Sequence, residues 1–201
     1  MIAGFFPATV MPDPDWWQAL WPQPSQVLAA LGVTPGTDTA VDLCCGDGLF
    51  TVPLARLARY VAAIDIDPRM LTRAREKVTE VDNTGACEFI AGDAYDIAKL
   101  VQNMADVVLI ANVFHGVPDK ARLARGVAAI LKPTGRFIVV NWHQRPREET
   151  IVLGQSRGPP TEMRMTPDEV TAAVVPAGLR PARVIDLPPY HYGAIFETST
   201  D

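Results

Sequence analysis

A short run of residues in the first quarter of the chain has the composition of a ligand-binding turn. Residues 40–50 read AVDLCCGDGLF, so an apolar stretch that contains Asp42 leads directly into Gly46 and Gly48. The apolar stretch predicts a strand, and the residues after Gly48 predict the start of a helix. A strand, a glycine turn and a helix in this order bring bare backbone N–H groups and a helix N-terminus against a ligand.

The carboxylate that precedes the glycines narrows the kind of ligand. An acid at this position repels a pyrophosphate and attracts an ammonium group. S-adenosylmethionine carries an α-ammonium group and a sulfonium, so Asp42 favours a methyl-donor site. Two alternatives stay open: the run can be a simple turn, or it can bind a dinucleotide. The second is weaker because Thr51 replaces the third glycine of the G-x-G-x-x-G pattern.

Two more aspartates follow apolar stretches farther along the chain. Asp65 comes roughly 20 residues after the glycines, where a carboxylate can accept hydrogen bonds from both hydroxyls of a ribose. Asp67 stands directly before Pro68, and we expect it to cap the helix that this proline begins. Asp93 follows Gly92, and a Gly-Asp pair alone is a common turn.

Alternating strand and helix patterns surround these residues. Strand-like apolar stretches occur at 40–44, 61–64, 88–91, 107–111 and 137–140, and helical patterns lie between them at 51–59, 68–81, 96–101 and 118–131. This alternation predicts a parallel sheet with helices on both faces. Near the end, Thr166 and Glu169 form a capping-box pattern, and residues 184–187 and 192–196 predict a hairpin whose last strand is antiparallel.

Together these motifs resemble class I S-adenosylmethionine-dependent methyltransferases from residue 40 onward. The glycine turn is similar to the D-x-C-C-G-x-G variant of ubiquinone and menaquinone methyltransferases, with Cys44 in place of the first glycine. The turn at 131–136, LKPTGR, resembles the family's L-K-P-G-G. The resemblance implies a three-layer Rossmann-like α/β fold, mostly parallel, with strand order 3-2-1-4-5-7-6.

The resemblance also implies roles for individual residues. Cofactor contacts are expected from Asp42, Cys44, Gly46, Gly48, Asp65, Ile66, Met70, Asp93, Ala94 and Asn112. Ile66 and Met70 would pack on the adenine, Asp93 and the Ala94 N–H would bind its polar edge, and Asn112 would lie near the methionine moiety. The stretch at 109–115 lacks the D/N-P-P-Y/F motif of methyltransferases that act on amino groups of nucleobases or glutamine.

Composition limits the classes of partner. The chain has 201 residues and a formal net charge of −5, which argues against general binding to the phosphate backbone of nucleic acids. No apolar run approaches the roughly 20 residues of a membrane helix. The three cysteines form no C-x-x-C pair, so we expect no metal site and a reducing, cytoplasmic setting.

Histidines are the candidates for a general base. Methyl transfer from a sulfonium needs positioning, and it needs a base only when the acceptor must lose a proton. His115, His143 and His191 are expected at the carboxyl ends of strands, with His143 favoured over His115 as the base. A three-histidine metal site is a weaker alternative.

Two segments are expected to complete the site. Residues 1–35 are interpreted as a lid, with Trp16, Trp17 and Trp21 over the reacting methyl group, and residues 36–201 as the cofactor-binding domain. The loop at 144–165 carries four arginines, which suggests a small-molecule acceptor with an anionic group; pairing with glutamates of the loop is the alternative. A cofactor-binding module without turnover and a nicotinamide-dependent oxidoreductase remain as other functions.

Overall fold

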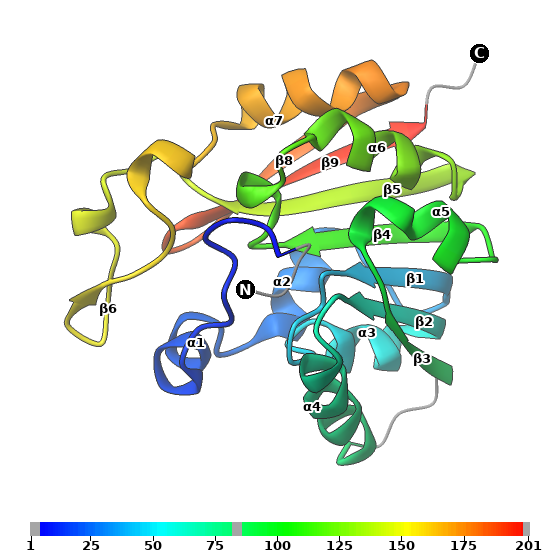
Figure 1. The fold of residues 1–201 in the computed structure, drawn as a ribbon, viewed down its shortest axis with the longest axis horizontal. Helices are drawn as coiled ribbons and strands as arrows, with labels where there is room; N and C mark the ends of the chain where they lie inside the picture. Colours follow the sequence, from blue (N-terminus) through cyan, green and yellow to red (C-terminus); the bar gives the residue numbers. More distant parts are fainter. Residues whose placement is uncertain (1–4, 82–85, 199–201) are drawn as a thin grey trace.

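A seven-stranded sheet organises the chain (Figure 1) in a computed structural model that describes residues 5–81 and 86–198. Its order is β3-β2-β1-β4-β5-β9-β8. The strands are β1 (Thr37–Leu43), β2 (Ala58–Asp65), β3 (Ala86–Ala91), β4 (Ala105–Ala111), β5 (Leu131–Trp142), β8 (Leu179–Leu187) and β9 (His191–Thr198). The first five strands are parallel, and β9 runs antiparallel to both of its neighbours. The predicted fold class and strand order are therefore confirmed, once the small hairpin of β6 and β7 is left out of the numbering.

Helices cover both faces of this sheet. One face packs against α5 (Ile97–Leu100), α6 (Lys120–Ala128) and α7 (Pro167–Val174). The other packs against α1 (Pro14–Leu20), α2 (Pro24–Ala30), α3 (Thr51–Leu57) and α4 (Pro68–Thr79). Successive strand residues serve opposite layers: Val108 and Ile110 belong to the first core, and Val107 and Leu109 to the second. Burial on both faces explains why these strands are apolar throughout rather than alternating.

Local signals place most helix ends correctly. Asp67 accepts a hydrogen bond from the Arg69 N–H and caps α4, and the capping box of Thr166 and Glu169 opens α7. The start of α6 differs from the prediction, because Asp119 rather than a residue before Pro118 caps it. Among the described residues, no helix is both long enough and apolar enough to cross a membrane.

The stretch at 144–165 is more ordered than its composition suggests. It contains a hairpin of β6 (Ile151–Val152) and β7 (Gln155–Ser156), which projects from the body of the domain (Figure 1). Arg164 is buried and donates to Thr150 and to the carbonyls of Arg145, Arg157 and Pro159. One buried guanidinium therefore holds this segment in place.

The edge of the sheet that matters for function is the one where the parallel strands end. β1, β2, β4 and β5 present their carboxyl ends there, and open α/β sheets bind ligands in the crevice outside those ends. The N-terminal segment runs across the same edge before α1 (Figure 1). Segments far apart in the sequence thus meet at one place.

Candidate active site

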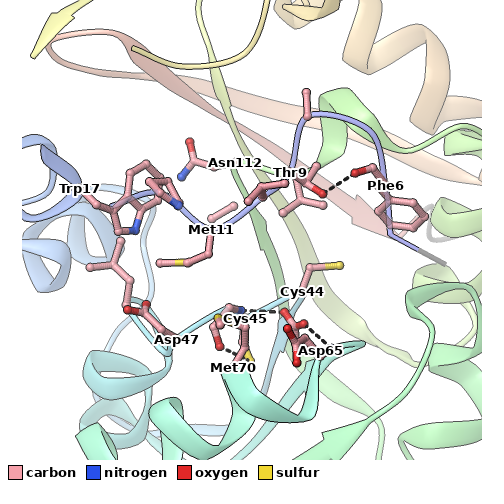
Figure 2. A pocket seen from close by; sticks show the side chains of 18 of the residues that line it. Phe6, Thr9, Met11, Trp17, Cys44, Cys45, Asp47, Asp65, Met70 and Asn112 are labelled. Atoms are coloured by element: carbon pink, nitrogen blue, oxygen red, sulfur yellow. Dashed lines mark hydrogen bonds between the residues drawn. The ribbon is translucent and has the colours of Figure 1, made fainter. Parts of the chain in front are cut away.

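A cavity of about 1010 Å³ lies at the carboxyl ends of the parallel strands. Its lining includes most of the residues predicted for the cofactor: Asp42, Cys44, Gly46, Asp65, Ile66, Met70, Ala94 and Asn112. Figure 2 shows part of this lining, with Met11 and Trp17 across from Cys45 and Met70. Gly48, Asp93 and His143 are not among the lining residues.

The glycine turn is held in a left-handed backbone conformation. Gly46 and Gly48 have φ values of +55° and +87°, which glycine adopts without steric cost. Gly48 has a packing role: a Cβ there would lie 2.9 Å from Cα and Cβ of Ala74 in α4. Cys44, in the position of the family's first glycine, has a φ of +61°, so it adopts a glycine-like conformation despite its side chain.

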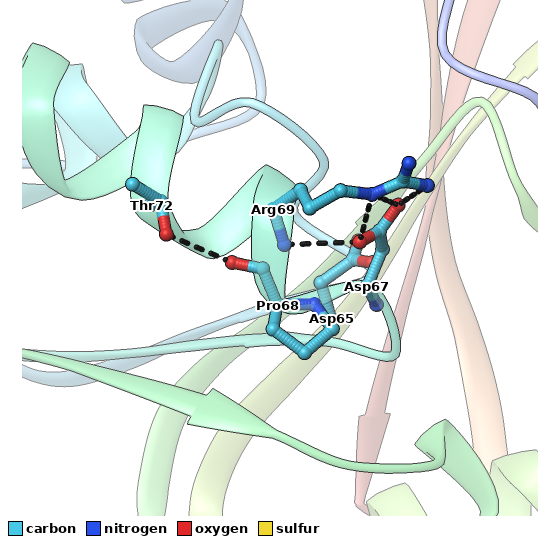
Figure 3. A network of polar contacts seen from close by, with 5 residues as sticks. All are labelled: Asp65, Asp67, Pro68, Arg69 and Thr72. Carbon is cyan, nitrogen blue, oxygen red and sulfur yellow. Dashed lines mark hydrogen bonds and ion pairs between the residues drawn. The ribbon is translucent and has the colours of Figure 1, made fainter.

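Asp65 ties β2 to the glycine turn. Its Oδ2 accepts from the Gly46 N–H at 2.8 Å, and its Oδ1 accepts from the Asp67 N–H at 2.9 Å. Asp67 in turn binds the Arg69 side chain, as Figure 3 shows. Burial raises the pKa of Asp65, and its backbone hydrogen bonds oppose that shift.

Asp42 is buried at the end of β1 below the turn. Its Oδ2 accepts from the Thr51 hydroxyl at 2.6 Å. Burial raises the pKa of Asp42 from 3.8 to about 7, the Thr51 hydrogen bond lowers it, and the charge of Asp65 raises it further. Thr51 stands where a dinucleotide motif has its third glycine, and here its hydroxyl donates a hydrogen bond to Asp42. An ammonium group in the cavity would favour the charged form of Asp42.

Asn112 follows β4 and carries two signs of a ligand-binding residue. Its φ is +61°, and both atoms of its buried side-chain amide lack a hydrogen-bond partner among the described residues. Unsatisfied buried groups and left-handed backbone are costly and gather at functional sites. Asp93 differs: it accepts from the Tyr95 N–H at 2.9 Å and caps a short 3₁₀ helix, while its neighbours Gly92 and Ala94 line the cavity.

Of the three histidines, His115 lines the cavity, and His143 and His191 are not among its lining residues. The Nδ1 of His115 lies 3.3 Å from Asn141 Oδ1, and its Nε2 lies 3.3 Å from the Ala8 carbonyl. Burial lowers the pKa of His115, and those two contacts oppose the shift. Within residues 5–81 and 86–198, no three His, Cys, Asp or Glu side chains are placed to hold a metal ion.

The preference for His143 over His115 as the base stays a prediction, and the structure gives the position of His143. His143 lies outside the cavity lining, and its Nε2 binds Asp186 of β8 at 2.8 Å. His191 is buried between Trp21 and Trp142, with ring-centroid distances of 4.5 and 4.1 Å. The position of His143 has a geometric cause, because β9 pairs with β5 and the His143 N–H donates to the Tyr190 carbonyl of the turn before β9.

The N-terminal tryptophans are part of the cavity and of the core. Trp16 and Trp17 lie in α1 and line the cavity, whereas Trp21 packs edge-to-face on Phe50. Ahead of them, the Met11 sulfur would lie 3.1 Å from a Cβ at Gly46, so this segment reaches the glycine turn. The lid prediction covers residues 1–35, of which 1–4 lie outside the described residues.

The loop at 144–165 contributes two arginines to the cavity. Arg147 and Arg157 line it, whereas Arg145 does not. None of the loop arginines forms an ion pair with Glu148, Glu149 or Glu162 among the described residues. Arg164, grouped in the sequence with the candidates for anion binding, is the buried anchor described above. The residues around Arg164 in the sequence form no motif that indicates this role.

The fold and the cavity define a Rossmann-like α/β domain with acids at the ends of β1 and β2. Residues 41–139 match the model of the methyltransferase domain family. The ubiquinone biosynthesis O-methyltransferase of Xanthomonas campestris pv. campestris (strain B100) is 29% identical over 140 residues, which span 65% of this chain and 57% of that protein. The demethylmenaquinone methyltransferase of Lactobacillus johnsonii is 30% identical over 120 residues, 58% of this chain and 48% of that protein.

Solved structures share the fold of this chain. A methyltransferase from Aquifex aeolicus that depends on S-adenosylmethionine superposes with a TM-score of 0.74 at 22% identity, over 93% of this chain and 94% of that one. A glycopeptide N-methyltransferase complexed with sinefungin gives 0.68 at 16% identity, over 88% and 85%. Over residues 41–139 the chain is similar to methyltransferase domains, and over nearly its whole length it shares the fold of S-adenosylmethionine-dependent methyltransferases. It covers about half the length of the relatives with which it shares sequence.

Proposed function

We propose that this chain transfers the methyl group of S-adenosylmethionine to a small-molecule acceptor. One observation carries the proposal: Asp65 ends β2, lines the cavity and holds the glycine turn through the Gly46 N–H. A carboxylate has about four lone-pair sites, so Asp65 can accept from the hydroxyls of a ribose beside its backbone donors. Bound S-adenosylmethionine supplies an activated methyl group, so the protein's task is to orient the acceptor and exclude water.

We propose contacts for this cofactor along its length. Ile66 and Met70 offer an apolar surface for the adenine, and the Ala94 backbone lies at the same end of the cavity. We propose Asp93 as a hydrogen-bond acceptor for the adenine amino group, because one of its oxygens has no hydrogen-bond partner among the described residues. At the other end, we propose that Asp42 and the Asn112 amide, which both line the cavity, bind the α-ammonium group and the carboxylate.

The acceptor end of the cavity has aromatic and cationic walls. Trp16, Trp17 and Trp142 line it, together with Arg147 and Arg157. We propose an acceptor with an anionic group and a lid formed by residues before α2. His115 is the candidate base for an acceptor that must lose a proton, since burial keeps its imidazole neutral near pH 7.

Two other functions are less well supported. A nicotinamide-dependent oxidoreductase needs a helix packed closely on the third glycine, and Thr51 occupies that place with its hydroxyl on Asp42. A module that binds the cofactor without turnover has the same acids as the enzyme. The two differ only in catalysis, so a methyl-acceptor screen separates them.

Calorimetric titration with S-adenosylhomocysteine, NADH and NADPH tests the proposal. We expect binding of S-adenosylhomocysteine alone. Replacing Asp65 with Ala removes charge-assisted hydrogen bonds worth about 1.5–3 kcal/mol, which corresponds to roughly 10–150-fold weaker binding. Asp96→Ala is the matched control, because Asp96 is exposed and pairs with Lys99 away from the cavity lining. Undiminished affinity in a folded Asp65→Ala variant would refute the cofactor orientation.

A further inference from the structure

Arg157 is a cation that lines the cavity and has no ion-pair partner among the described residues. Its Nε is buried without a hydrogen-bond partner from residues 5–81 or 86–198. A buried donor without a partner costs free energy, so its presence in a binding cavity points to a ligand that supplies the acceptor.

The loop holds the Arg157 backbone firmly. Its N–H donates to the Thr150 carbonyl at 2.9 Å, and its carbonyl accepts from the Thr150 hydroxyl at 2.7 Å. The same carbonyl accepts from Nη2 of the buried Arg164 at 3.1 Å. The guanidinium therefore projects from a fixed point, and a ligand would meet a prearranged group rather than a mobile one.

An aromatic ring of the cavity wall contacts the Arg157 guanidinium. The guanidinium carbon lies over the Trp16 ring, 5.1 Å from its centroid. A cation–π contact of this kind uses no N–H group of the arginine as a donor to an oxygen acceptor. The Nε and Nη donors of one edge are parallel and match the two oxygens of a carboxylate.

Three acids that line the cavity already have partners other than Arg157. Asp67 binds Arg69, Asp47 binds Lys77, and Asp65 accepts from the backbone of the glycine turn. Arg147 is a weaker candidate than Arg157, because its Nε donates to the Gly158 carbonyl at 3.0 Å. The unpaired edge of Arg157 is therefore the best-placed anion-binding group on the acceptor side.

We propose that the Nε–Nη edge of Arg157 is a carboxylate-binding subsite of this cavity. The assignment rests on the proposed function, since it places the ligand beside S-adenosylmethionine. The carboxylate has two available sources: the acceptor, or the methionine end of the cofactor itself. Both present the same planar group to the same edge.

Calorimetry on the intact chain separates these sources. S-adenosylhomocysteine carries the methionine-derived carboxylate, and 5′-methylthioadenosine lacks it. Benzoate and benzyl alcohol, titrated into protein saturated with S-adenosylhomocysteine, form a matched pair for the acceptor. The variants are Arg157→Gln, Arg157→Lys and the control Arg145→Gln, which alters an arginine of the same loop outside the cavity lining.

Arg157→Gln should weaken binding of one carboxylate ligand at least tenfold and leave its neutral counterpart unchanged. A loss of affinity for S-adenosylhomocysteine assigns the subsite to the cofactor, and a loss of affinity for benzoate assigns it to the acceptor. Arg157→Lys keeps the charge without the fork and should restore only part of the affinity.

Three results would overturn the subsite: no loss on either carboxylate, an equal loss on the neutral partner, or the same loss in Arg145→Gln. Binding of 5′-methylthioadenosine also reports that each variant is folded. If the wild-type chain binds neither adenosine ligand, the proposed function itself has failed, which is a separate outcome.

Discussion

Replacing Asp42 with Asn should stabilise the free protein at neutral pH while weakening cofactor binding. Asp42 is buried at the end of β1, and its nearest polar partner is the neutral Thr51 hydroxyl. Asparagine has nearly the same shape, and its Oδ1 can still accept from Thr51. The substitution therefore removes a charge from a desolvated position with little change in packing.

The pKa of Asp42 determines the size and the sign of this effect. A rise from 3.8 to about 7 corresponds to about 4 kcal/mol of unfolding free energy that is lost once the group is fully charged. Because the folded-state pKa is the higher one, stability is full below pH 4 and falls as pH rises toward about 7. The asparagine of the Asp42→Asn variant does not titrate, so the variant should equal the wild type near pH 4 and exceed it by up to about 4 kcal/mol at pH 8.

Urea unfolding of both proteins at pH 4, 6 and 8 measures this difference, and other titrating groups cancel in the comparison. Calorimetry at pH 8 should show weaker binding of S-adenosylhomocysteine by the variant, because the α-ammonium loses its counter-charge. A variant less stable than the wild type at pH 8, or a stability difference independent of pH, would refute the reasoning.

Three further predictions concern His115, His191 and Gly48. His115→Gln should lower kcat about 100-fold with a hydroxyl acceptor. It should also remove the fall in rate at pH values below 6.5 that protonation of His115 causes in the wild type. Unchanged kcat would eliminate His115 as the base. His191→Phe should raise stability by about 1 kcal/mol, because Nε2 is buried and unpartnered among the described residues. Burial lowers the pKa of His191, so the wild-type protein loses stability as pH falls below 6.5. Thermal melts at pH 5 should show a smaller loss in His191→Phe. An equal loss in both proteins would contradict a role for His191. Gly48→Ala should lower the free energy of unfolding in urea by about 1–3 kcal/mol, because the added Cβ would meet Ala74. The control is Gly36→Ala, which should cost less, since φ is also positive there but no atom lies within 4 Å of the added Cβ. Equal costs would assign the effect to φ alone.

The fold was accessible from the sequence because its signals are local and agree with one another. Apolar stretches of strand length alternate with helical patterns, and caps such as Asp67 and Thr166 mark helix starts. The hairpin of β6 and β7 gave no such signal. Its position depends on Arg164, whose hydrogen bonds reach residues 5 to 19 positions away in the chain. Contacts of that kind follow from tertiary packing rather than from a motif.

The site was predictable where backbone geometry fixes it and not where the topology of the last strands decides. Asp42, Gly46 and Asp65 follow from strand ends and a glycine turn. His143 also follows a strand, yet pairing of β5 with β9 directs it to Asp186. The contact of the Ala8 carbonyl with His115 joins residues 107 positions apart, and no pattern within either segment indicates it.

The backbone strain of this chain is concentrated where the ligand is expected. Four described residues other than glycine have positive φ, and three of them, Ala8, Cys44 and Asn112, line the cavity. Each such conformation has an energetic cost that the surrounding packing must offset. The unpartnered Asn112 amide and the buried charge of Asp42 add to that cost in the free protein. A ligand that brings an ammonium group to Asp42 and hydrogen bonds to Asn112 relieves both penalties, so part of its affinity comes from defects already present in the free protein.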